Sequence, residues 1–144
     1  MLLTLCIFLA ASLTGHTVTA ETDPALAIRA DDPDLVWGPC PPFFAETCRI
    51  AVLHGSPEAP NADVFFKVAP GEVLPHHWHT SAERMVLVAG RLEIQYDGQA
   101  TVILEPGTYA YGPPKLPHLG QCQSSEACVL FIAFEGPVDA HLVE

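Results

Sequence analysis

The chain has 144 residues, of which 49% are hydrophobic, and carries 17 acidic side chains against 6 basic ones, for a net charge of -11. Once a short N-terminal leader is subtracted, this length suits one domain and leaves no room for a second catalytic domain. The scarcity of basic residues argues against nucleic acid and anionic membrane surfaces as partners. Because 14 prolines and 10 glycines disfavour long helices, we expect an all-β domain.

The first twenty residues have the pattern of a secretory leader. An apolar run over 2–13 is followed by small and polar residues and by Val18-Thr19-Ala20, which resembles a signal-peptidase site. The run is too short to cross a bilayer comfortably, although no lysine or arginine precedes it. We expect a signal peptide over 1–20, export to the periplasm or the medium, and no membrane attachment after cleavage. The alternative is an ordinary buried N-terminal segment.

Four cysteines follow the leader and fall into two local pairs, Cys40 with Cys48 and Cys122 with Cys128. Four cysteines allow three pairings, and the short turn-prone segment inside each local pair favours the disulfides Cys40–Cys48 and Cys122–Cys128. Each would stabilise the fold by about 2–3 kcal/mol. The alternative is four buried thiols in a reducing cytoplasm. A cysteine zinc site is disfavoured because no Cys-x-x-Cys spacing occurs.

Residues 21–49 lack a clean hydrophobic period and are expected to form an N-terminal arm that packs on the main domain, which then occupies 50–144. From Arg49 onward, short apolar runs alternate with turn residues, as is typical of a β-sandwich or barrel. Asp97-Gly98 predicts a two-residue hairpin turn. The expected strands cover 50–53, 63–68, 73–79, 83–89, 91–96, 101–104, 109–112 and 127–134.

Candidate metal ligands gather in one part of the sequence. His77 and His79 are two residues apart on an expected strand and therefore share a face, whereas His76 points to the opposite face. A turn after His79 would bring Glu83 of the return strand beside the two imidazoles. His118 is the candidate fourth donor. Imidazole nitrogens together with a carboxylate oxygen suit a divalent ion such as Fe, Mn, Cu, Zn or Ni.

These residues fall within two motifs that resemble those of the cupin family. The first motif is Gly-x5-His-x-His-x3–4-Glu-x6-Gly, and it is matched by Gly71, His77, His79, Glu83 and Gly90. The second motif is Gly-x5-Pro-x-Gly-x2-His-x3-Asn, and it is matched by Gly107, Pro113 and His118. Lys115 and Cys122 stand where the second motif has glycine and asparagine. The resemblance covers about residues 63–134.

The resemblance implies a double-stranded β-helix, or jelly-roll barrel, which also removes the open edges of eight short strands. It implies one divalent transition metal ion held by His77, His79, Glu83 and His118, with one or two coordination positions left for water, substrate or dioxygen. Barrels of this family often pair through their outer strands, which leaves a homodimer open. Because imidazole must be neutral to bind a metal, metal binding is expected to weaken below about pH 6.

The expected cavity wall is apolar. Strand parity places on the ligand face, or on its continuation, Val73, Pro75, Met85, Leu87, Leu92 and Ile94. No arginine is aimed inward, so a neutral, ketonic or aromatic small molecule fits better than a small dicarboxylate. The sequence thus favours an exported metal-dependent oxidoreductase of dioxygenase type, or a Lewis-acid isomerase. The alternative is a non-catalytic module that binds a metal or a small ligand.

Overall fold

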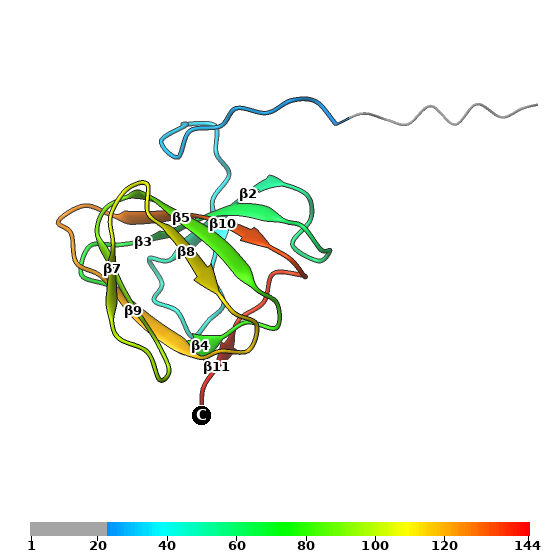
Figure 1. Ribbon diagram of the computed structural model, residues 1–144. Helices are drawn as coiled ribbons and strands as arrows, with labels where there is room; N and C mark the ends of the chain where they lie inside the picture. Colours follow the sequence, from blue (N-terminus) through cyan, green and yellow to red (C-terminus); the bar gives the residue numbers. More distant parts are fainter. Residues whose placement is uncertain (1–22) are drawn as a thin grey trace, which may run out of the picture.

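The computed structural model describes residues 23–144, which form two antiparallel sheets that face each other around a closed interior (Figure 1). One sheet has the strand order β1-β2-β3-β10-β5-β8, and the other has the order β11-β4-β9-β6-β7. The strands are β1 (Gly38–Pro39), β2 (Arg49–His54), β3 (Asp63–Val68), β4 (Val73–Trp78), β5 (Glu83–Ala89), β6 (Leu92–Tyr96), β7 (Val102–Leu104), β8 (Tyr109–Gly112), β9 (His118–Cys122), β10 (Cys128–Phe134) and β11 (His141–Leu142). The predicted all-β double-stranded β-helix is confirmed.

The expected signal peptide over 1–20 lies outside the described residues. Across residues 23–144 no helix is long and apolar enough to cross a membrane.

All eight predicted strands are present, with ends that differ by one residue at most, but the sequence did not predict β9. This strand lies between β4 and β6 and carries His118, which pairs with His77 of β4 and with Tyr96 of β6. Gly120 in its middle weakened the strand signal. The glycine is required there, because a Cβ at this position would approach the Glu93 carbonyl oxygen to 2.7 Å. The two-residue strands β1 and β11 were also not predicted.

The interior is filled by apolar side chains from the inner faces of both sheets. Met85, Leu87, Leu92 and Leu104 are among the side chains that are fully buried. The strand parity predicted for the start of β4 is wrong, because Val73 is 57% exposed whereas Leu74 is 4% exposed. The pairing of β4 with β9 shifts register between Leu74 and His77, and such an irregularity reverses which side chains face inward.

The segment before β2 closes one side of the barrel. Its first described residues lead away from the sheets (Figure 1), and β1 then pairs with β2. Residues 40–48, which we call the N-terminal disulfide loop, are joined at their ends by the predicted disulfide Cys40–Cys48. Phe44 inside this loop is buried in the main core.

Trp37 lies just before β1. The Lys67 Nζ atom lies over its ring, 3.8 Å from the ring centroid.

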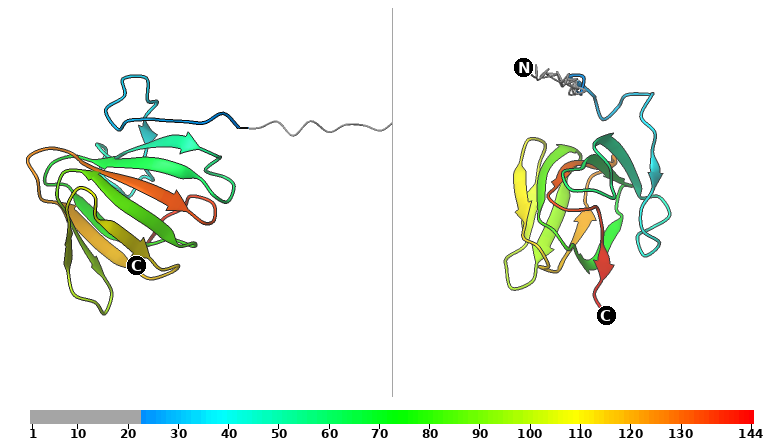
Figure 2. Two further views of the ribbon diagram at one scale, coloured as in Figure 1. Left: turned by 45° about the horizontal axis from the view of Figure 1, so that its top comes forward. Right: turned by 90° about the vertical axis from the view of Figure 1, so that its right-hand side faces the viewer.

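The second predicted disulfide, Cys122–Cys128, joins the end of β9 to the start of β10 and so links the two sheets. Gly90 packs directly against it: a Cβ there would lie 2.9 Å from the Cys128 sulfur, and the φ angle of Gly90 is 82°. Only glycine combines that conformation with that close approach. At the other end of the barrel, β11 pairs with β4, so the C-terminal segment lies beside the strand that carries His77 (Figure 2).

Candidate metal centre

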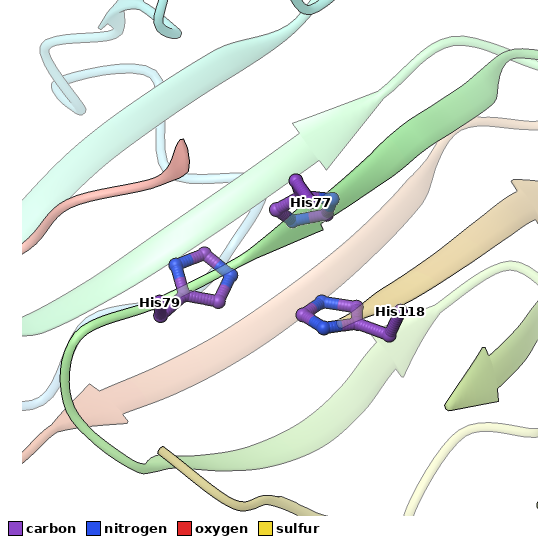
Figure 3. Close-up of side chains that lie close together, drawn as sticks. All are labelled: His77, His79 and His118. Carbon is purple, nitrogen blue, oxygen red and sulfur yellow. The ribbon is translucent and has the colours of Figure 1, made fainter. Parts of the chain in front are cut away.

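Three imidazoles meet inside the barrel, those of His77, His79 and His118 (Figure 3). His77 lies on β4, His79 lies in the turn that follows, and His118 begins β9. One ring nitrogen from each lies within 4.8 Å of those of the other two. All three side chains are buried, at 3%, 8% and 4% exposure respectively. Buried imidazoles that converge on one point are the usual arrangement of a transition-metal site.

The second ring nitrogen of each histidine faces a backbone carbonyl. His77 Nδ1 donates to the Pro75 oxygen at 2.6 Å, His79 Nδ1 donates to the Asp139 oxygen, and His118 Nδ1 lies 3.4 Å from the Leu116 oxygen. Because a carbonyl only accepts, Nδ1 carries the proton and Nε2 of the neutral ring is left with a free lone pair. Such backbone contacts orient the histidines of metal sites.

Glu83, the first residue of β5, lies beside this cluster. Its Oε2 atom is 3.3 Å from His79 Nε2 and 3.9 Å from His118 Nε2. The group of ligand atoms that all lie within 4.8 Å of one another contains the three histidines but not Glu83. The structure therefore brings three of the four predicted ligands into one cluster and places the carboxylate of the fourth next to two of them.

Burial keeps the four side chains uncharged near neutral pH. Burial, with a smaller contribution from the Asp139 carboxylate, raises the pKa of the Glu83 carboxyl to about 8. Burial, together with the neighbouring imidazoles, lowers the pKa of His77 to about 4 and that of His118 to about 3. The pKa of His79 is also lowered, chiefly by burial. A cation that binds here meets neutral imidazoles and must displace the proton of Glu83.

A cavity of about 80 Å³ opens beside the histidines. Its apolar wall includes Ile50, Phe66, Leu74, Leu130, Ile132 and Phe134. Of the residues that strand parity predicted for the wall, Met85, Leu92 and Ile94 line the cavity; Leu87 is buried elsewhere in the core, and Val73 and Pro75 do not line it. No arginine or lysine of the described chain lines it, and Asp139 is the one acidic residue besides Glu83 that does.

The N-terminal disulfide loop forms part of this wall, which the sequence did not reveal. Cys40, Pro41 and Phe44 line the cavity. The Phe44 ring meets the His77 imidazole edge-on, with the ring centroids 5.0 Å apart. The adjacent aromatic pair Phe43-Phe44 between two cysteines was the available signal, but nothing local to it indicates contact with residue 77.

Two neighbouring histidines lie outside the cluster. His76 points away from the cavity, and its Nε2 atom lies 2.9 Å from Asp97 Oδ1. His141 stacks on the Trp78 ring, with the centroids 4.2 Å apart, and its Nε2 atom lies 3.2 Å from Asp139 Oδ2. Neither of these two side chains lines the cavity.

Residues 64–134 match the sequence model of a family described as a cupin domain. Among solved structures, this chain is 17% identical to the DMSP lyase DddQ from Ruegeria pomeroyi DSS-3, with 84% of this chain and 80% of that chain covered and a TM-score of 0.65. It is 19% identical to the polyketide cyclase RemF from Streptomyces resistomycificus, with coverage of 83% and 87% and a TM-score of 0.66.

A structure of the DMSP lyases RdDddP and RnDddQII is also similar, at 17% identity and a TM-score of 0.64. The comparison covers 76% of this chain but only 63% of that chain. No curated protein matches this chain in sequence. The structural likenesses, all below 25% identity, establish the fold.

Proposed function

This chain belongs to the cupin superfamily, and we propose that it is an exported enzyme that uses one divalent transition metal ion to act on a small organic molecule. The observation that carries the proposal is the arrangement of three buried imidazoles, each with Nδ1 toward a backbone carbonyl and Nε2 free, beside an apolar cavity. We assign the ligands as His77, His79, His118 and Glu83.

The donor set fits a metal ion on chemical grounds. Three neutral imidazoles and one carboxyl group are buried together, and a carboxylate without a cation would be costly at this depth. The mixture of nitrogen and oxygen donors accepts Fe, Mn, Co, Ni, Cu or Zn. Such an ion, when bound, supplies Lewis acidity and, if redox-active, electron transfer with dioxygen.

The protein's own contribution is to orient the metal ligands and to exclude water from the site. Backbone carbonyls hold the three imidazoles in one tautomer. The apolar wall keeps bulk water from the reacting atoms, and Phe44 of the N-terminal disulfide loop covers the His77 side. The Glu83 carboxyl group holds a proton near neutral pH and would release it when the cation binds.

The cavity limits the substrate class. A volume of about 80 Å³ admits only a small molecule or one end of a larger one. The wall offers no cationic side chain from the described residues, and two carboxyl groups line it. A neutral or cationic substrate is therefore favoured over a small dicarboxylate, which would need a cationic partner.

Dioxygenase-type oxidation is the reaction we put first, because an apolar site with imidazole donors and open coordination positions suits oxygen chemistry. The second candidate is redox-neutral elimination or cyclisation. It is favoured by the Lewis acidity that a bound ion would supply without any change of oxidation state, and we would assay such reactions because a lyase and a cyclase have a similar fold.

One experiment separates these reactions. The metal-free protein is loaded separately with each first-row divalent ion and incubated with diketones, phenols, flavonoids and DMSP in an oxygen electrode, with products identified by mass spectrometry. Oxygen uptake with oxygenated product supports the dioxygenase, whereas conversion without oxygen uptake supports the redox-neutral reaction. The His118→Ala variant loaded in the same way is the control.

The third outcome is tight metal binding with no turnover. It would favour a non-catalytic module that stores or senses a metal or a small ligand, and would contradict both enzyme proposals.

The export proposal is supported by the two disulfides, which are typical of an oxidising compartment, and by the leader-like sequence over 1–20. Fractionation of the native host tests it, because an exported protein begins at residue 21 and lies outside the cytoplasm.

A further inference from the structure

A buried tyrosine hydroxyl lies close to this site without a hydrogen-bond partner. Tyr96 ends β6 and pairs with His118 of β9, and its ring centroid is 4.8 Å from that of His118. The side chain is 8% exposed, and its hydroxyl has no partner anywhere in residues 23–144. A buried polar group without a partner destabilises the fold, so its presence calls for an explanation, such as a functional role or a bound water or ion.

The surroundings of Gly112 show where this hydroxyl lies relative to Glu83. Gly112 ends β8 and pairs with Glu83 at the start of β5. A Cβ on Gly112 would lie 2.6 Å from the Tyr96 hydroxyl oxygen and 3.1 Å from Glu83 Oε2. The two oxygens therefore border the same small space, which only glycine leaves open. Tyr96 comes from one sheet, and Glu83 and Gly112 come from the other.

We infer that Tyr96 is a positioning residue for Glu83: its hydroxyl donates a hydrogen bond to the ionised Glu83 carboxylate, directly or through one water molecule, and Gly112 keeps the space for it. The inference rests on the proposed metal site, because it is the bound cation that makes the carboxylate an acceptor-only group. The hydroxyl does not line the cavity, so Tyr96 acts on a substrate only through Glu83.

Outer partners of metal ligands typically contribute a factor of about 10–100 to metal affinity. Tyr96→Phe removes only the hydroxyl and keeps the ring that packs on His118. We expect this variant to bind Co²⁺ about 10–100-fold more weakly than the wild type. The matched control is Tyr109→Phe, which removes a hydroxyl from a tyrosine that is 60% exposed, and it should bind Co²⁺ as the wild type does.

The test measures Co²⁺ affinity by competition with a chelator, together with the visible spectrum of the bound ion. It uses the wild type, the two tyrosine variants, Glu83→Gln, and the double variant Tyr96→Phe with Glu83→Gln. If the hydroxyl acts through the carboxylate, Tyr96→Phe weakens binding in the wild type but adds nothing in the Glu83→Gln background. The metal-free Tyr96→Phe protein should melt no lower than the wild type, because the hydroxyl it loses has no partner.

Two results would overturn the inference alone. Tyr96→Phe could bind Co²⁺ with unchanged affinity, or it could lose the same factor in both backgrounds, which would mean that the hydroxyl acts through His118 or the fold. A wild-type protein that binds no divalent ion at all would instead overturn the proposed function, and this inference with it.

Discussion

The Nε2 atom of His79 lies 3.3 Å from the Oε2 atom of Glu83, and both side chains are almost fully buried. An ion pair at this depth would have to offset the desolvation of two charges. Burial instead raises the pKa of Glu83 and lowers that of His79, so both groups stay neutral near pH 7. The site is thus uncharged until a cation displaces the carboxyl proton, and the first two predictions follow from this relationship.

Metal binding should depend on pH through Glu83 rather than through the histidines. Below the Glu83 pKa of about 8 the cation must displace one proton, so its affinity should fall by about one decade per pH unit between pH 7.5 and 5. His77 and His118, with pKa values of about 4 and 3, should compete only in more acidic solution. This prediction replaces the sequence-based expectation that metal binding weakens only below about pH 6, where ordinary histidines become protonated. Calorimetric titration in buffers of different ionisation enthalpy measures the proton count; release of no proton at pH 6.5 would contradict this reading.

The stability of the metal-free protein should fall as pH rises from 6.5 to 8. The folded state keeps the Glu83 proton up to a pKa of about 8, whereas the unfolded chain loses it near 4.5. The stabilisation that is fully present below pH 4.5 is therefore lost progressively as the pH rises to about 8. The buried histidines act in the opposite direction, but only below their ordinary value of 6.5.

Calorimetric melting temperatures at several pH values check this second prediction. Glu83→Gln should flatten the decline above pH 6.5, whereas Glu105→Gln, which changes an exposed carboxylate, should leave it unchanged. A decline of equal size in both variants would mean that Glu83 is not its source.

Removing one imidazole should abolish tight metal binding. His77→Ala, His79→Ala and His118→Ala should each lower the affinity at least about 100-fold, more than the loss of an outer partner typically costs. His76→Ala is the matched control, because this neighbouring histidine contacts Asp97 outside the cavity. Elemental analysis after dialysis gives the metal content of each variant. Full metal content in the His118→Ala variant would refute the ligand assignment.

The Cys40–Cys48 disulfide should support both the fold and the site. Replacing both cysteines by serine should lower the free energy of unfolding by about 2–3 kcal/mol in urea titrations. Because the loop carries Phe44, which packs on His77, metal affinity should fall as well.

The pair Cys122 and Cys128 provides the comparison for this variant, since its sequence separation is 6 against 8 and neither residue lines the cavity. Replacing that pair should destabilise the protein with little effect on metal affinity. Equal losses of affinity in both double variants would mean that the N-terminal disulfide loop has no particular effect on the metal site.

Local patterns in the sequence were sufficient for most of the fold. Turn residues delimit strands β2 to β8 and β10, and the His77, His79 and Glu83 spacing places three groups on one hairpin. The disulfide pairing was also predictable, because each pair spans a short turn-prone segment. These features depend on neighbours in the chain, which is why a single sequence shows them.

What the sequence did not reveal depends on contacts between distant segments. Strand β9 exists because it pairs on both sides with β4 and β6, although Gly120 weakens its own strand propensity. The exposure of Val73 follows from a register shift that no alternation pattern records. Phe44 and Tyr96 reach the site only through the closure of the barrel.

Anomalous diffraction from crystals of the protein loaded with Co²⁺ or Zn²⁺ tests the central claim most directly. The account predicts one strong peak per chain, about 2.0–2.2 Å from the Nε2 atoms of His77, His79 and His118 and from a carboxylate oxygen of Glu83. A peak elsewhere, such as between His76 and Asp97, or no peak within bonding distance of those three nitrogens, would contradict it.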